Sequence, residues 1–360
     1  MCERFDRSRL PDLSALVRGE AASARRSFLK RSAAGVITMA APPGLFSTGA
    51  LAAAEGTLRS THGTGFCNLN LFLSHALQTA ADDGLMIEFV NTPTFAEQVT
   101  FLGIGEVDVG LMPYTSFVAL FDAGAPVKIV AGGGVEGCAI VAQPGLDSAE
   151  KLVGKTLGTF QLDTLEVMPY DWLKANGVAL ADTNVRYMAN TPEAVEAFKA
   201  GALDWICTIE PYASALLNDV PGSIMLSDGT DIYGPGYTDC VLAARESLID
   251  EGRDELKALI KGMMIAQRMA ETEPQKTLDE VVGTYYKTSM ENARIGLSKQ
   301  PAVVDARDQT GFILDRTDSL VEMGYIENKP GRDAIDWTLL EEVIAENAEL
   351  YDTLERKAAA

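Results

Sequence analysis

The sequence has few of the residues that metal and nucleic-acid sites need. Of its 360 residues only two are histidines and five are cysteines, and no C-x-x-C pair occurs. A zinc or iron–sulfur centre therefore has little support, and we expect no cofactor. Acidic residues outnumber basic ones by 51 to 30, which gives a formal net charge of −21. Because no basic stripe offsets this charge, a phosphate backbone would be repelled, and nucleic acid is a poor partner.

Long apolar runs and internal repeats are also missing. No stretch of about 18 uninterrupted apolar residues occurs, so we do not expect the mature chain to span a membrane. No unit of about 20–50 residues recurs, which argues against a solenoid or a propeller. Hydrophobic residues make up 47% of the chain and charged residues 22%. This balance is typical of a globular protein with a substantial core.

The N-terminal region resembles an export signal. Arg25-Arg26 is followed by Ser-Phe-Leu-Lys, as in twin-arginine signals, and a weakly apolar stretch extends to Leu51. The stretch closes with the small residues of a cleavage site at Ala50–Ala54. We predict that residues 1–54 are a twin-arginine signal peptide, that cleavage occurs near Ala54, and that the mature protein is periplasmic. The alternative is a basic N-terminus beside an accidental alanine-rich tract.

From residue 58 onward, short apolar runs alternate with amphipathic segments, which predicts an α/β protein with parallel sheets flanked by helices. A glycine triplet at 132–134 interrupts the pattern, and from residue 246 the chain is mostly helical, with one run expected at 302–323. Strands are expected at 58–60, 86–90, 107–112, 127–131, 138–142, 156–160, 184–188, 205–208 and 240–244. Helices between them are expected at 69–77, 94–102, 115–123, 163–176 and 191–200, with tail helices at 253–273 and 274–286.

Two such series followed by a helical tail predict two lobes that the chain crosses twice. We place the crossings near 139–144 and 238–244. The first lobe then comprises residues 55–142 and 240–360, and the second lobe comprises residues 143–239. Ligands of such folds bind where the loops at the carboxyl ends of the strands face one cleft.

Three local phrases carry a family resemblance. Gly105–Gly110 reads G-x-x-D-x-G, and Ala149–Gly158 reads like dL-x-G-K-x-x-G with Glu-Lys at the usual acidic position. Ala197–Asp204, followed by Glu210-Pro211, reads like A-x-x-A-G-x-x-D…E-P. In this order the phrases resemble the periplasmic binding proteins of nitrate-, sulfonate- and taurine-type transporters, over about residues 58–245.

The resemblance implies a two-lobed periplasmic-binding-protein fold without catalysis. It also implies an ABC permease with its ATPase as partner, met at the inner membrane, and a monomeric protein that captures a small ligand. The same fold serves thiamine-pyrimidine proteins and an aromatic desulfinase, so the resemblance leaves the ligand open. A role in ligand sensing beside a membrane receptor is an alternative that the sequence does not separate from uptake.

Candidate ligand contacts lie in the strand-to-helix turns that are expected to face the cleft. They offer hydroxyl, amide, carboxylate and aromatic groups, although several of them are equally suited to cap the helix that follows. The candidates are Thr64, Phe66, Asn68, Thr94, Tyr114, Thr115, Gln161, Asp163, Thr164, Glu210, Tyr237 and Asp239.

The charges in these loops bear on the ligand class. They contain acids but no arginine or lysine, and an arginine clamp is the usual way to hold a sulfonate or carboxylate. We therefore place an amine or a nitrogen heterocycle ahead of a simple anion, with a sulfonate- or taurine-like ligand as the other candidate.

The cysteines leave two further alternatives open. Cys67 lies at an expected helix start, five residues after His62, so a cysteine-dependent, desulfinase-like enzyme is the rival function. Cys138 and Cys240 begin the two strands expected at the crossings. They are either joined by a disulfide across neighbouring crossings or are two small buried side chains.

Overall fold

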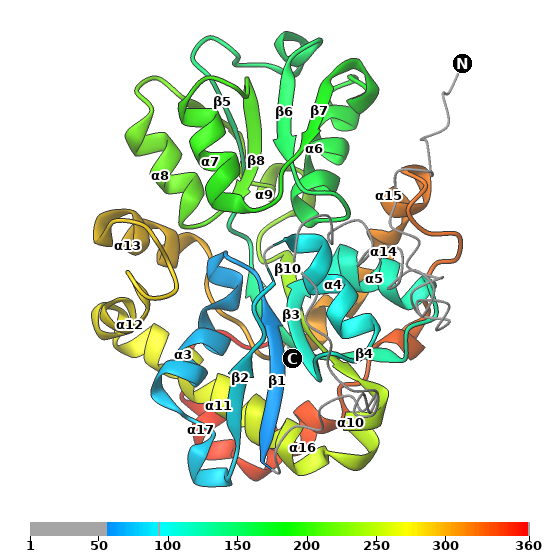
Figure 1. Ribbon diagram of the computed structural model, residues 1–360, viewed down its shortest axis with the longest axis vertical. Helices are drawn as coiled ribbons and strands as arrows, with labels where there is room; N and C mark the ends of the chain where they lie inside the picture. Colours follow the sequence, from blue (N-terminus) through cyan, green and yellow to red (C-terminus); the bar gives the residue numbers. More distant parts are fainter. Residues whose placement is uncertain (1–55, 93, 359–360) are drawn as a thin grey trace, which may run out of the picture.

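The computed structural model describes residues 56–92 and 94–358, which form two lobes, each built on one five-stranded sheet (Figure 1). The predicted signal peptide and its cleavage site lie outside the described residues. Within the described residues, no helix combines the length and the apolar character needed to cross a bilayer.

The sheet of the first lobe has the strand order β2-β1-β3-β10-β4. β1 is parallel to β2 and β3, whereas β10 is antiparallel to both β3 and β4. The strands are β1 Thr57–His62, β2 Met86–Phe89, β3 Val109–Pro113, β4 Val127–Val135 and β10 Thr238–Arg245. The helices of this part are α3 Leu69–Leu77, α4 Phe95–Gly103, α5 Tyr114–Asp122, α10 Glu246–Glu251, α11 Arg253–Thr272, α12 Pro274–Val281, α13 Met290–Lys299, α14 Thr310–Asp315, α15 Thr317–Glu322, α16 Thr338–Glu346 and α17 Ala348–Asp352.

The sheet of the second lobe has the order β7-β6-β8-β5-β9. β6 is parallel to β7 and β8, and β5 is antiparallel to β8 and β9. Its elements are β5 Cys138–Ala142, β6 Thr156–Thr159, α6 Thr164–Ala175, β7 Asn184–Tyr187, α7 Thr191–Lys199, β8 Trp205–Ile209, α8 Tyr212–Asp219, β9 Ile224–Ser227 and α9 Thr230–Tyr233.

Side-chain caps fix where the helices that face the cleft begin. The Thr94 hydroxyl accepts the backbone N–H of Glu97, and the Glu97 carboxylate accepts the backbone N–H of Thr94, which is a complete capping box. Asn190 caps α7 by accepting the backbone N–H of Glu193. Such caps are local in sequence, and α4, α6 and α7 begin within one residue of their predicted starts.

The sequence pattern suggested that a strand ends just before the glycine triplet, but the strand continues through it. β4 continues through Gly132 and Gly134 to Val135. A Cβ on Gly134 would lie 2.5 Å from the Cα of Cys67, and one on Gly132 would lie 2.4 Å from the carbonyl oxygen of Val303. These glycines are therefore positions where other backbone segments press against a buried strand, and the sequence pattern gave no sign of those segments.

The predicted lobe boundary at residue 142 needs correction. β5 belongs to the second sheet, so the chain leaves the first sheet after Val135. Glu136 and Gly137 turn the chain there with φ of 58° and 81°. At the crossings the backbone N–H of Glu136 donates to the carbonyl oxygen of Tyr237 at 2.8 Å. Both sheets are mixed, because the chain enters each lobe from the other through an antiparallel strand.

The tail differs from the expected helices in two segments. The helix expected at 274–286 ends earlier, at Val281, as α12. The run expected at 302–323 is divided between α14 and α15, and Ala302 pairs with Gly134 beside β4. Gln300, at the end of α13 just before this run, donates from its side chain to the carbonyl oxygen of Glu136 at 2.9 Å. The apolar residues of 302–306 are buried because they cover the sheet as an extended segment, which has no helical period.

Candidate functional site

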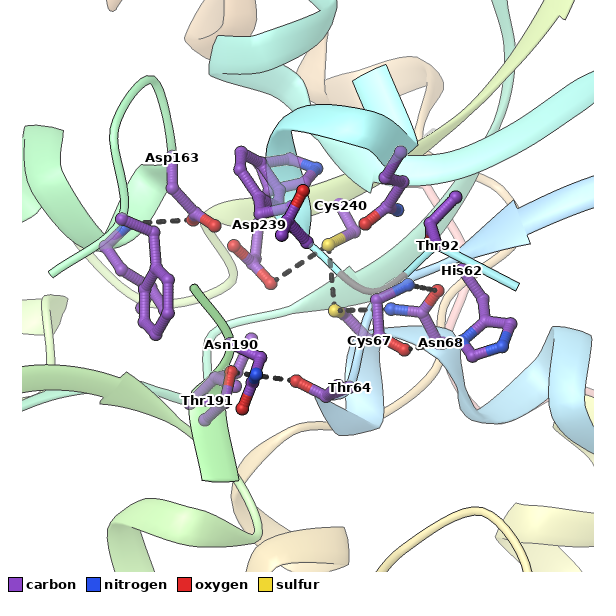
Figure 2. Close-up of a pocket in the computed structure, with 18 of the residues that line it drawn as sticks. His62, Thr64, Cys67, Asn68, Thr92, Asp163, Asn190, Thr191, Asp239 and Cys240 are labelled. Atoms are coloured by element: carbon purple, nitrogen blue, oxygen red, sulfur yellow. Dashed lines mark hydrogen bonds between the residues drawn. The ribbon is translucent and has the colours of Figure 1, made fainter. Parts of the chain in front are cut away.

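A cavity of about 80 Å³ lies between the two lobes, and both lobes contribute to its lining (Figure 2). The first lobe contributes His62, Gly63, Thr64, Cys67, Asn68, Thr92, Thr94, Phe95, Gln98, Pro113, Asp239 and Cys240. The second lobe contributes Phe160, Asp163, Leu165, Ala189, Asn190, Thr191 and Ile209. Most of these residues lie where a strand ends and a helix begins, which is the expected ligand position in two-lobed α/β folds.

The lobes touch each other around this cavity. The Thr64 hydroxyl donates to the Thr191 hydroxyl at 2.8 Å, and the backbone N–H of Phe95 donates to the Ala189 carbonyl oxygen at 3.4 Å. Beside them, the backbone N–H of Phe66 donates to the carbonyl oxygen of Glu210 at 2.8 Å. Because these bonds join groups on opposite lobes, the structure represents a closed arrangement.

A second set of contacts between the lobes involves the buried carboxylate of Glu166 on α6. Both carboxylate oxygens accept the phenol of Tyr325 at 2.7 Å, and one of them accepts the phenol of Tyr187 at 2.6 Å. Burial raises the pKa of Glu166, and these hydrogen bonds lower it in part. Tyr325 belongs to the C-terminal region of the first lobe, so hydrogen bonds from this region hold α6 of the second lobe against the first lobe.

Asp163 brings one carboxylate to the cavity from the second lobe. It is the N-cap of α6 and accepts the backbone N–H of Leu165 at 3.0 Å. Its side chain is buried, and burial, followed by the nearby Asp239, raises its pKa well above the ordinary value. The structure therefore shows the cap, and because the same side chain also lines the cavity, contact with a ligand stays a prediction.

Asp239 brings a second carboxylate from β10 of the first lobe. It is 1% exposed and accepts from the thiols of Cys240 at 3.2 Å and Cys138 at 3.5 Å, and from the Gln300 amide at 3.3 Å. Burial raises its pKa, and the thiol hydrogen bonds lower it in part. Thiols are weak donors, so this carboxylate is poorly neutralised for so buried a charge.

None of the residues that line the cavity in the described part of the chain is a lysine or an arginine. Its one histidine, His62, lies against the rings of Phe72 and Phe89 and donates from Nδ1 to the carbonyl oxygen of Gly63 at 2.8 Å. Burial lowers the pKa of His62, which favours the neutral ring. The ionisable acids of the cavity are thus Asp163 and Asp239. Burial raises the pKa of both, and a ligand that carries positive charge or several N–H donors would stabilise their charged forms.

Two thiols lie beside Asp239 in the lining. The Sγ atoms of Cys67 and Cys240 are 2.8 Å apart, and the Asn68 amide donates to the Cys67 sulfur at 3.2 Å. One ligand atom from each of Cys67, Asp239 and Cys240 lies within 4.8 Å of the others, the one such candidate metal-binding cluster among the described residues. Two thiolates on one zinc ion, with bonds of about 2.3 Å, would be roughly 3.8 Å apart, so this pair is too close for that geometry.

Five of the twelve sequence candidates line the cavity: Thr64, Asn68, Thr94, Asp163 and Asp239. Thr94 and Asn68 also hold local structure, because Thr94 closes the capping box and Asn68 accepts the backbone N–H of Gly63 at 3.0 Å. These residues share a position at the start of a helix or on the returning strand β10.

The other seven candidates lie outside the lining and have local partners or buried positions. The ring of Phe66 packs edge-on against Tyr286, and that of Tyr114 packs against Phe312. The Glu210 carboxylate accepts from Ser214 and pairs with Lys299, and the Tyr237 phenol donates to the Asp228 carbonyl oxygen. The remaining three stand near the lobe contact, where the Thr115 hydroxyl donates to the Leu162 carbonyl oxygen, Thr164 is buried and Gln161 is half-buried.

Sequence reasoning missed part of the lining. Asn190 and Thr191 lie at a strand-to-helix turn with a cap and a proline at the next position, the same signal that marked Thr94. Gln98 and Cys240 carried no such signal. Gln98 lies within α4, and Cys240 lies within a buried strand whose neighbours are set by long-range pairing.

Of the two alternatives for Cys138 and Cys240, the structure shows two buried side chains and no disulfide, and all four described cysteines are free. The disulfide alternative assumed that β5 and β10 run side by side, but they belong to different sheets. Cys240 lies beside Cys67 instead, while the Cys138 thiol faces the Asp239 carboxylate.

Comparison with known proteins places this geometry in a family. The NMT1-like family model matches residues 64–284. No curated protein sequence matches the chain. The ligand-binding component of an ABC-type import system from Staphylococcus aureus, with zinc bound, is similar in structure. It has a TM-score of 0.69 and 16% identity, over 80% of this chain and 98% of that one.

Two further solved structures show the same fold. The alkanesulfonate-binding protein from Xanthomonas axonopodis pv. citri bound to MOPS has a TM-score of 0.67 and 17% identity, over 77% of this chain and 96% of that one. The periplasmic nitrate-binding protein from Synechocystis PCC 6803 has a TM-score of 0.71 and 14% identity, over 84% and 92%. The predicted two-lobed periplasmic-binding-protein fold is thereby confirmed.

Proposed function

Because the chain belongs to the NMT1-like family, we propose that it is the substrate-binding component of an ABC-type importer. It captures a small polar molecule between its lobes and delivers it to a permease with its ATPase. The observation that carries this proposal is a cavity lined from both lobes and closed by hydrogen bonds between them. A ligand held on both sides stabilises the closed state, which is the form that a transporter can distinguish from the open one.

The charges of the cavity suggest the ligand class. Two buried carboxylates, Asp163 and Asp239, reach one small space that has no lysine or arginine in its described lining. An amine, an amidine or an amino-substituted nitrogen heterocycle would pair with them and offset their burial. A sulfonate or nitrate would meet two carboxylates with no cation to hold it, so it is the second candidate. Its support comes from two similar structures, an alkanesulfonate-binding protein bound to MOPS and a nitrate-binding protein.

A binding role also agrees better with the state of Cys67 than an enzyme does. Burial raises the pKa of its thiol to about 12. Among the described residues no hydrogen bond joins Cys67 to His62, which is engaged with Gly63. A nucleophilic cysteine needs a lowered pKa or an adjacent base, and Cys67 has neither.

The cellular location follows from the same role. We propose that the mature protein acts as a monomer in the periplasm after twin-arginine export and meets its permease at the inner membrane. The export part of this proposal depends on residues 1–54 of the sequence.

The experiment is native mass spectrometry of the periplasmic protein, followed by identification of any molecule that co-purifies. Calorimetry should then compare small amines and aminopyrimidines with taurine and nitrate. Binding of a cationic or nitrogen-rich molecule supports the proposal. Tight binding of taurine or nitrate alone would overturn the ligand class, and sulfite release from aromatic sulfinates would overturn the binding role.

A matched set of isosteric variants sharpens this test. Asp163→Asn keeps the helix cap, because asparagine caps as well as aspartate, and removes only the charge. Asp163→Asn and Asp239→Asn should each weaken binding of a cationic ligand at least tenfold, since a charge-assisted hydrogen bond is lost. Asp305→Asn removes a buried carboxylate that is paired with Arg307 outside the cavity lining, and it should leave affinity unchanged.

A further inference from the structure

Cys67 and Cys240 lie together in the lining of the cavity (Figure 2). Cys67 is in the 3₁₀ helix Phe66–Asn68 and Cys240 is on β10, 173 positions apart in the chain. Each side chain is 2% exposed, and their Sγ atoms are 2.8 Å apart. That separation is within an ångström of a disulfide bond of about 2.05 Å.

Backbone packing fixes both cysteines. Cys240 pairs in register with Gly134 of the adjacent strand β4. The Cα of Cys67 occupies the place where a side chain of Gly134 would lie, 2.5 Å from the ideal Cβ position. The missing side chain of Gly134 therefore lets the helix that carries Cys67 settle on the sheet beside Cys240. The two sulfurs lie close together because the backbone segments that carry them are packed against each other.

The surroundings give the two thiols different chemistry. The Cys67 sulfur accepts hydrogen bonds from the Cys240 thiol and from the Asn68 amide, so a negative charge is better supported on Cys67. The Cys240 thiol lies between Cys67 and a carboxylate oxygen of Asp239 at 3.2 Å, which is able to take up its proton. Of the two sulfurs, Cys67 is therefore the one that attacks and Cys240 the one that resolves. Because burial raises the pKa of the Cys67 thiol to about 12, the reaction is slow at neutral pH and becomes faster as pH rises, unlike that of an enzyme nucleophile.

We propose that Cys67 and Cys240 form a reversible dithiol–disulfide site inside the ligand cavity, oxidised by small hydroperoxides that enter through it. The Cys67 thiol releases its proton, the thiolate attacks one peroxide oxygen and the O–O bond breaks. The hydroxide that leaves takes up the released proton, so a sulfenic acid and one water form. The Cys240 sulfur then attacks the sulfenic sulfur, the S–O bond breaks, and a second water leaves. In balance, two thiols and one hydrogen peroxide give one disulfide and two waters.

Oxidation of the two thiols changes the hydrogen bonding of the neighbouring Asp239 carboxylate. The disulfide has no S–H, so Asp239 loses the hydrogen bond from Cys240 and keeps those from Cys138 and Gln300. The redox state of the pair thereby acts on a carboxylate that lines the cavity. This chemistry goes beyond the importer proposal and does not depend on the ligand, since it requires only the cavity and its two thiols.

The test counts thiols in the full chain carrying Cys2→Ser, which leaves the four described cysteines. After reduction, denatured protein should show four thiols. After hydrogen peroxide at pH 8 it should show two, and dithiothreitol should restore four. Peptide mapping should show Cys67 joined to Cys240. Four thiols after peroxide treatment, or a bond to Cys138 or Cys207, would overturn the proposal.

Variants assign the roles of the two cysteines, and a zinc-binding experiment distinguishes a disulfide from a metal site. Cys240→Ser should leave a sulfenic acid on Cys67 that dimedone traps, and Cys67→Ser should leave its three thiols intact. Cys207→Ser is the matched control: it removes a buried cysteine outside the cavity lining and should still form the bond. Stoichiometric zinc binding that protects Cys67 and Cys240 from peroxide would overturn the proposal in favour of a metal site.

Discussion

The hydroxyl of Thr64 donates a hydrogen bond to the hydroxyl of Thr191, 2.8 Å away on the opposite lobe. Both residues line the cavity, and Figure 2 shows the bond spanning it between the two lobes. Because the two residues belong to opposite lobes, this bond forms only when the lobes close. A change at this bond therefore tests lobe closure directly.

Removal of this bond should shift the protein towards the open form. Thr64→Val keeps the shape of the side chain and removes the donor, at a cost of about 0.5–1.5 kcal/mol in the closed state. Small-angle scattering of the unliganded variant should give a larger radius of gyration than that of the wild type. Thr100→Val is the control, because the Thr100 hydroxyl bonds within its own helix to the Ala96 carbonyl oxygen. Identical radii for wild type and Thr64→Val would contradict a role in closure.

The buried carboxylates should make the unliganded protein less stable as pH rises. Burial raises the pKa of Asp239, whereas an unfolded aspartate has a pKa of about 3.9. Above that value the folded chain holds a proton that the unfolded chain has released. The contribution of Asp239 to stability is therefore fully present at low pH and is lost as pH rises through the folded pKa. Asp239→Asn should flatten this decline and raise the unfolding temperature at pH 8, measured by thermal scans from pH 4 to pH 8.

An acid with the opposite shift provides the control. Burial alone would raise the pKa of Asp305, but hydrogen bonds from Arg307 and Tyr351 lower it. Its contribution to stability is present at neutral pH and is lost as pH falls. Asp305→Asn should therefore destabilise the protein at pH 8. Equal effects of the two substitutions at pH 8 would show that charge burial at Asp239 is not the cause.

The close approach at Gly134 predicts a large effect from a single methyl group. Gly134→Ala would place Cβ 2.5 Å from the Cα of Cys67, which is backbone and cannot rotate away. Overpacking of this kind typically costs about 1–3 kcal/mol, and urea unfolding should show it. Gly311→Ala is the control, because nothing lies within 4 Å of its Cβ position in α14. That change should leave stability equal or slightly higher, and a similar loss at both positions would refute the packing argument.

Export can be tested in cells. Arg25→Lys together with Arg26→Lys should trap an uncut precursor in the cytoplasm, because the paired arginines are the signal that the twin-arginine route reads. Immunoblots of periplasmic and cytoplasmic fractions measure this. Mature protein in the periplasm of the double variant would rule out that route.

The sequence by itself determined the features that depend on neighbours in the chain. Short apolar runs and helical patterns predicted most strands and helices of both lobes, and caps such as Thr94 and Asp163 marked where helices begin. The charge balance of the cleft loops was also visible, since it depends only on which residue types follow each strand. These signals are local, so they survive without knowledge of the fold.

Only the tertiary structure decided which of these turns meet. Thr64 and Thr191 face each other, whereas Tyr114 packs into the core against Phe312. Gly134 appeared to be part of a loop, but it lies in a strand that another segment approaches closely. Cys240 contacts Cys67 and not Cys138, because strand order in the two sheets places it there. Such contacts arise from long-range packing, which no local pattern along the chain encodes.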